Sequence, residues 1–241
     1  MTSLFGSLSF NDLNEVFPNP PIREVAFEIR FAPRLRINAD IWQLQDRLVE
    51  SYPNVSTESI TQPTGLININ VFQSPDTGRL IKISQQNCVV AFTRYARFED
   101  FKEEVTQRIG MLCETFNITS FTRVGLRYIN DIVIPSGDPV AVLRYVSPPV
   151  DFERMPIDAI QHFVTEFQVR YKDHFVTLRG ALLAPRTDSQ RVYVLDVDCH
   201  SMAIETVEHV PEVLDKYHDA AQRFFLEHVT EDFKKVMRGN R

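Results

Sequence analysis

Apolar and polar residues alternate along residues 23–31 in the pattern of a half-buried β-strand. Its apolar positions are Val25, Phe27, Ile29 and Phe31, and its polar positions are Glu24, Glu28 and Arg30. Because successive side chains of a strand point to opposite faces, the first set is predicted to face a core and the second to face away from it.

The same alternation recurs at residues 121–133, near the middle of the chain. Arg123 and Arg127 fall on one face with Gly125 between them. The opposite face carries Val124, Leu126 and Tyr128. This segment is therefore predicted to be a strand that buries one face and presents a cationic stripe on the other.

Helices are predicted where apolar residues recur every three or four positions. The clearest spans residues 98–116, and another begins at Asn38, a favourable N-cap residue, and ends near Pro53. A long helix over about 210–229 and a short one capped by Asp138 complete the set. Further strands are predicted at about 55–60, 65–73, 79–85, 88–95, 161–172, 174–184 and 190–200.

The order strand, helix, four strands, helix is thus predicted for the first half and nearly repeated in the second. This order resembles the tandem architecture of the TATA-binding-protein-like folds, which implies an α+β protein with one curved antiparallel sheet, helices on one face and the other face open. The predicted organisation is an N-terminal arm (1–20), a first α+β half (21–118) and a second half (119–241), which share one continuous sheet.

The polar faces of the strands are the candidate site. Glu28, Arg30, Arg123 and Arg127 come from two of these strands, and Asp196, Asp198 and His200 share one face of the last strand. The aspartates are interpreted in three ways: as cross-strand partners of Arg123, Arg127 or Arg179, as part of a surface that binds a polar ligand, or as a metal or acid–base site.

The composition and the motifs of the chain argue against several classes of function. The net charge is −6 and the sequence pI is about 5.6, which argues against a nucleic-acid-binding surface. The three cysteines form no CxxC pair, the six histidines have no metal-ligand spacing, and no phosphate-loop or nucleophile-elbow motif occurs. No signal peptide or long apolar run is present. We therefore expect a cytoplasmic protein with no catalytic residue, no metal site, no cofactor and no contact with a membrane.

The first 20 residues are too apolar for a segment that stays in water. They carry Leu4, Phe5, Leu8, Phe10, Leu13, Val16 and Phe17 before a run of prolines. The arm is predicted to dock on the body of the protein or on a neighbouring subunit, and a homo-oligomer held through the arm is the expected assembly.

Three separated motifs resemble one protein family. They are Asn19-Pro-Pro-Ile-Arg-Glu-Val-Ala-Phe-Glu-Ile-Arg-Phe31, Arg123-Val-Gly-Leu-Arg-Tyr-Ile-Asn130 and Leu195-Asp-Val-Asp198. The family is sporadically distributed among bacteria and archaea, its members have a similar length, and it has no established activity. The resemblance covers nearly the whole chain, and the sporadic distribution implies an accessory gene of a mobile or defence island.

The function predicted from these observations is a non-enzymatic binding or assembly protein. It would recognise a protein partner or an anionic ligand through Arg30, Arg123 and Arg127. The first alternative is a metal-dependent enzyme or nucleotide binder that uses Asp196, Asp198 and His200. The second is a nucleic-acid-binding saddle, against which the acidic composition argues.

Overall fold

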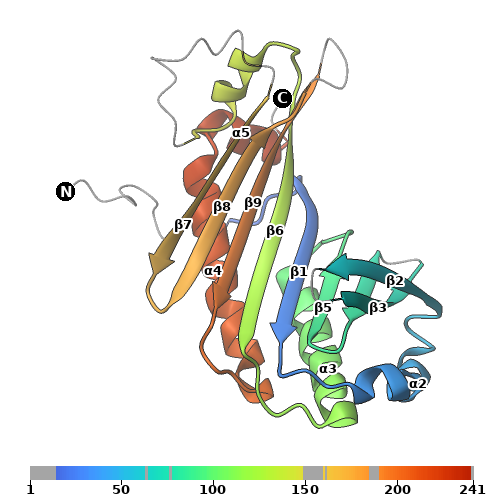
Figure 1. Cartoon of the computed structure of the whole chain (residues 1–241). Coiled ribbons are helices and arrows are strands. Elements are labelled where there is room, and N and C mark those ends of the chain that lie inside the picture. The colour runs from blue at the N-terminus through green and yellow to red at the C-terminus, as the bar shows by residue number, and fades with distance from the viewer. Residues whose placement is uncertain are drawn as a thin grey trace. The chain divides into compact units, whose positions relative to one another are not determined.

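The computed structural model describes residues 15–62, 65–75, 78–148, 160, 162–184 and 190–239. These residues form a mixed α+β fold around an antiparallel sheet of nine strands in the order β2-β3-β4-β5-β1-β6-β9-β8-β7 (Figure 1). The predicted fold class is confirmed. The order makes β1 and β6, the first strands of the two predicted halves, neighbours. The tandem repeat and the three segment boundaries stay predictions.

The elements agree closely with the predicted ranges. The strands are β1 (Ile22–Arg30), β2 (Asn54–Gln62), β3 (Gly65–Ser74), β4 (Arg79–Ile83), β5 (Asn87–Phe92), β6 (Arg123–Ile134), β7 (Phe163–Tyr171), β8 (His174–Leu182) and β9 (Arg191–Ser201). The helices are α2 (Arg36–Leu48), α3 (Phe98–Phe116), α4 (Val210–His228) and α5 (Glu231–Met237), with 3-10 turns η1 (Pro139–Arg144) and η4 (Val207–His209).

The chain divides into two compact units. Unit 1 consists of the described residues of Met1–Arg23, Tyr128–Cys199 and His218–Arg241. Unit 2 consists of those of Glu24–Arg127 and His200–Tyr217. Of the predicted site residues, Asp196 and Asp198 belong to unit 1, and Glu28, Arg30, Arg123 and Arg127 belong to unit 2.

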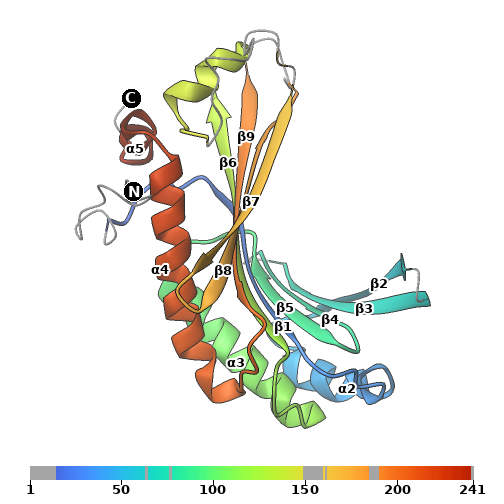
Figure 2. The ribbon, with the colours of Figure 1, turned by 60° about the vertical axis from the view of Figure 1, so that its left-hand side comes forward.

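Unit 2 is a curved sheet with α2 and α3 on one face (Figure 2). The apolar positions of β1 point toward these helices: Val25, Phe27 and Ile29 are fully buried, as predicted. The buried stripe of α3 includes Phe101, Val105, Ile109 and Leu112, and Phe101 packs edge-on against Phe92 of β5. Burial of one face therefore fixes which side chains β1 presents on the other.

The predicted N-cap of α2 is wrong. The helix begins at Arg36 after Leu35, and Asn38 lies inside its first turn. Ile37 is fully buried, so packing of this side chain into the core starts the helix before the asparagine is reached. Tertiary burial here outweighs the capping preference of Asn.

Unit 1 contains β7, β8, most of β9 and the second half of β6, together with α5 and the C-terminal half of α4. Part of the N-terminal arm also docks in this unit. Glu15 accepts hydrogen bonds from Nε and Nη2 of Arg238, both at 2.6 Å, and the backbone N–H of Asn19 donates to the carbonyl of Met237 at 3.0 Å. Residues 1–14 lie outside the described residues, so a homo-oligomer through the arm stays a prediction.

His228, at the end of α4, is a group in unit 1 that makes stability depend on pH. Its ring stacks on Phe167 and its Nδ1–H donates to the carbonyl of Phe224 at 2.8 Å. Burial lowers the pKa of His228 below its ordinary 6.5, and the hydrogen bond to Phe224 opposes this only in part. The unfolded chain then binds more protons in the acid range, so this contribution is complete above about pH 6.5 and is lost as the pH falls below it.

We therefore expect a smaller acid-induced fall in melting temperature for His228→Gln than for the wild type. The measurement is thermal unfolding at about pH 7.5 and about pH 5.5, on either side of the ordinary titration of histidine. Replacement of the exposed His162 by Gln is the control, and it should leave the fall unchanged. Equal falls for His228→Gln and the wild type would contradict the assignment.

Candidate functional site

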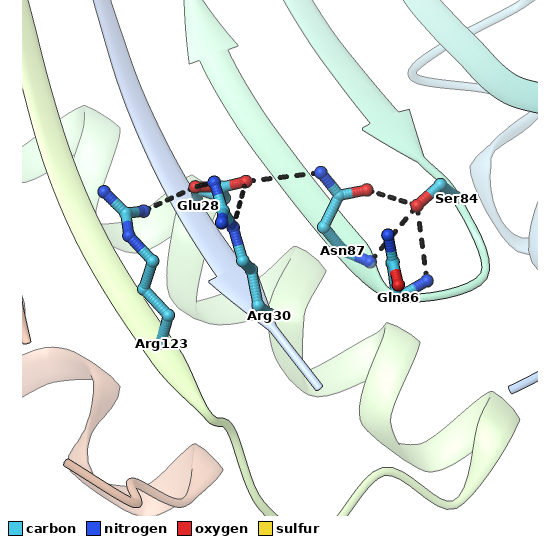
Figure 3. Close-up of polar contacts among 6 residues, drawn as sticks. All are labelled: Glu28, Arg30, Ser84, Gln86, Asn87 and Arg123. Carbon is cyan, nitrogen blue, oxygen red and sulfur yellow. Dashed lines mark hydrogen bonds and ion pairs between the residues drawn. The ribbon is translucent and has the colours of Figure 1, made fainter. Parts of the chain in front are cut away.

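The carboxylate of Glu28 is the centre of a polar cluster in unit 2. Glu28 and Arg30 lie on the face of β1 opposite its buried positions, called the open face below. Arg30 donates to Glu28 through Nε at 3.0 Å and through Nη2 at 3.2 Å. Arg123 of β6 donates through Nη1 at 2.5 Å, and Nδ2 of Asn87 donates at 3.2 Å (Figure 3). One carboxylate thus accepts four hydrogen bonds from three side chains.

Gly125 leaves the space in which the side chain of Arg123 lies. A Cβ atom added at Gly125 would be 2.8 Å from Nη1 of Arg123 and 3.2 Å from its Cζ. The guanidinium group therefore runs along its own strand, over the position where a side chain would otherwise stand. This close approach is a physical reason for glycine in the interior of a strand.

The turn between β4 and β5 fixes the orientation of Asn87. The Oγ of Ser84 accepts hydrogen bonds from the backbone N–H groups of Gln86 and Asn87, both at 3.2 Å. Its hydroxyl donates to Oδ1 of Asn87. Since the amide oxygen is held by Ser84, the amide nitrogen is turned toward Glu28 (Figure 3). Ser84 is 2% exposed, so this support is part of the folded core.

The guanidinium groups of Arg30 and Arg123 both bond to the carboxylate of Glu28, but the two arginines differ in exposure. The side chain of Arg30 is 53% exposed, and its two bonds to Glu28 do not use Nη1. The side chain of Arg123 is 12% exposed, and that of Glu28 is 20% exposed. Guanidinium groups bind carboxylates and phosphates in a planar, two-pronged geometry, so this arrangement suits an anion.

The other candidate site residues lie on β6 and β9. Arg127 is exposed on β6, on the same face as Arg123. On β9, Asp196 is 8% exposed and Asp198 is half-buried, whereas Leu195, Val197 and Cys199 are in the core. Within the described part of the chain, no group of three or more His, Cys, Asp or Glu side chains is arranged to hold a metal ion.

Sequence reasoning missed Asn87 and Ser84, and it noted Gly125 without assigning it a role. A signal existed for each of them. Serine and asparagine at the ends of a short hairpin turn are residues that bond to the turn backbone. A glycine between two arginines inside a strand indicates a close approach by another group. Asn87 lies 59 positions from Glu28 in the sequence, and Arg123 lies 95 positions from it. No local pattern connects residues so far apart.

No protein-family model matches this chain, and no curated protein matches it significantly. No helix in the described ranges is both long and apolar enough to cross a membrane.

Proposed function

We propose that the protein is a non-enzymatic, cytoplasmic binding protein whose open sheet face recognises an anionic group, a carboxylate or a phosphate, on a partner. The observation that supports this most directly is the pairing of Arg30 and Arg123 around Glu28. Arg127 extends the same cationic stripe along β6.

Glu28 gives the arginines a fixed geometry before a ligand arrives. A free arginine side chain carries about 2 kcal/mol of rotamer entropy, part of which is lost when it binds. Hydrogen bonds from Arg30 and Arg123 to one carboxylate reduce that cost because the side chains are already ordered. The guanidinium of Arg30, whose side chain is 53% exposed, is accessible to an arriving anion.

The first test is stabilisation by simple anions. Inorganic phosphate, pyrophosphate and citrate are added at constant ionic strength, and the melting temperature is measured. A ligand at 100 times its Kd stabilises a protein by about 2.7 kcal/mol. We expect the wild type to be stabilised by at least one of these anions and Arg30→Gln/Arg123→Gln to lose most of the increment.

The matched control is Arg179→Gln in unit 1. Arg179 is 52% exposed and is also paired with a glutamate, Glu166, of the neighbouring strand. This variant should keep the full increment. Equal increments in all three proteins, or no increment in the wild type, would refute the proposal.

Gly125→Ala tests geometry without removing charge. The added methyl group displaces the guanidinium of Arg123 from its place beside Glu28, so the anion-induced increment should shrink while the net charge is unchanged. Gly110→Ala on α3 is the control, since a Cβ there meets no atom within 4 Å.

A further inference from the structure

β2 is a sheet edge that is exposed along its length. Among the described residues it has β3 as its only neighbour. Every side chain from Asn54 to Thr61 is exposed, including Val55 at 43% and Ile60 at 46%. Within the described part of the chain, neither face of this strand is packed on a helix and no strand pairs with its outer edge.

This edge lacks the features by which proteins prevent strand addition. Such features are short length, bulges, proline and charged side chains, lysine above all. β2 is nine residues long and pairs with β3 residue for residue from Asn54↔Gln73 to Gln62↔Gly65, without a bulge. Its one charged residue is Glu58, and this carboxylate is engaged by Lys82 of β4 at 3.0 and 3.2 Å.

The opposite edge of the sheet is different. β7 has the same length but alternates between half-buried and exposed side chains, so one of its faces is packed. Its exposed face carries the charged residues Glu166 and Arg170. The contrast indicates that β2, and not β7, is built to accept a strand.

We propose that β2 pairs with β2 of a second copy of this chain, antiparallel, about a twofold axis that passes beside Ser59. A twofold axis perpendicular to the sheet keeps equivalent faces together, so residues of equal parity must oppose each other. The sheets of two copies then continue through the pair of edges.

Charge and apolar contact select the axis. A centre at Glu58 would set this carboxylate directly against its own copy, which is destabilising. A centre at Ser59 instead sets Glu58 against Ile60 of the partner and Thr57 against its Thr61, and it pairs residues 56–62 of both strands. Thr–Thr and Ser–Ser neighbours of this kind form favourable cross-strand pairs.

The same centre places the exposed Ile60 of each copy inside the new pair of strands, beside Glu58 of the other copy. Ile60 lies opposite Ile67 within one chain, and Glu58 lies opposite Ile69, all on the open face. Pairing at Ser59 places the row Ile67–Ile60 beside the row Glu58–Ile69 of the other copy. A centre at Thr57 also keeps Glu58 from its own copy, but it sets Ile60 against Asn54. A centre at Ile60 would set Ile60 against its own copy, but it would pair only residues 58–62 of each strand because β2 ends at Gln62. The centre at Ser59 pairs residues 56–62 and still covers Ile60, so its longer run of backbone hydrogen bonds favours Ser59.

The test is site-specific cross-linking in the full chain. Ser59→Cys places two thiols at the axis, where opposed Cβ atoms are about 4.5–5.5 Å apart, and mild oxidation should give a disulfide dimer. Val55→Cys is the control, because its two copies would be about 27 Å apart at 3.4 Å per residue. The three native cysteines are buried and burial raises the pKa of each, so they do not compete.

Light scattering on a sizing column provides the second measurement. We expect a dimer that Ile60→Lys dissociates and that Val133→Lys leaves intact, since Val133 is equally exposed at 46% but lies in β6. A monomer at every concentration, as expected if the edge binds a segment of another protein, would overturn the proposal. So would a dimer that survives Ile60→Lys and forms no disulfide through Ser59→Cys, as expected for assembly through the N-terminal arm.

Discussion

Replacement of Glu104 by alanine is expected to lower the free energy of unfolding by about 3–5 kcal/mol, the usual cost of breaking a buried ion pair from one side. Glu104 lies on the face of α3 that packs on the sheet of unit 2 and is 7% exposed. Its carboxylate accepts hydrogen bonds from the hydroxyl of Tyr52 at 2.8 Å, Nε of Arg108 at 2.6 Å and Nη1 of Arg79 at 2.8 Å.

The cost arises from the cation that remains. Arg108 is 9% exposed, and its guanidinium also stands over the ring of Tyr52. Without the carboxylate of Glu104, the buried guanidinium of Arg108 has no counter-ion from this residue. Arg79 is less affected because its side chain is 36% exposed and can turn toward water. Burial, and then the neighbouring carboxylate of Glu104, raises the pKa of Tyr52 far above its ordinary 10.0, so the phenol stays a donor throughout the working range.

Denaturant unfolding followed by circular dichroism measures the effect. Glu103→Ala, one position away on the exposed side of α3, is the control and should change stability by less than about 0.5 kcal/mol. The double variant Glu104→Leu/Arg108→Leu should lose less than Glu104→Ala alone, because it removes the stranded cation together with its partner. A loss below about 1 kcal/mol for Glu104→Ala would show that the network contributes little to stability.

Alternation made the strands and their faces predictable. The polar set of β1 and the cationic set of β6 were assigned to the open face from period two alone, and Glu28, Arg30 and Arg127 lie on it. The prediction succeeded because, once the apolar face of a strand is buried, the alternating side chains must lie on the opposite face. The apolar residues of α3 likewise predicted the bounds of the helix, Phe98–Phe116, because nineteen residues are enough to show the 3.6-residue helical period clearly.

α5 could not be predicted in this way. It has seven residues, too few for a helical period to be recognised. The available signal was local: Thr230 accepts a hydrogen bond from the backbone N–H of Phe233, and Glu231 and Asp232 follow in the first turn. Lys234 of this helix is 8% exposed and bonds to Glu231.

The contacts of the candidate site depend on strand order, which no local pattern contains. Glu28 meets Asn87 because β5 lies beside β1, and this pairing joins residues far apart in the chain. Before the order is known, Arg123 has several glutamates and aspartates as candidate partners. The sequence therefore predicts the face on which the site lies, and the fold selects which members of that face touch.

Replacement of Gly180 by alanine is the second change with a large expected effect, and here a normally favourable substitution should destabilise the protein. Alanine inside a strand is ordinarily better than glycine by about 0.5–1 kcal/mol. At Gly180 of β8, however, an added Cβ would overlap the hydroxyl of Tyr193 and lie 2.9 Å from its Cζ and 3.1 Å from Oγ1 of Thr165. Tyr193 is 1% exposed, so its ring is enclosed by other side chains. The same burial raises the pKa of Tyr193 to about 12.

Overpacking of this kind costs about 1–3 kcal/mol, which exceeds the gain from the backbone. Gly180→Ala should therefore lower the free energy of unfolding in urea by about 1–2 kcal/mol, and Gly110→Ala, in open space on α3, should not lower it. Removing the hydroxyl with Tyr193→Phe takes away the closest overlap, so the double variant should be more stable than the sum of the two single changes implies. Strict additivity would mean that β8 and β9 separate slightly to admit the methyl group, and that the close fit between Gly180 and Tyr193 is not what requires glycine there.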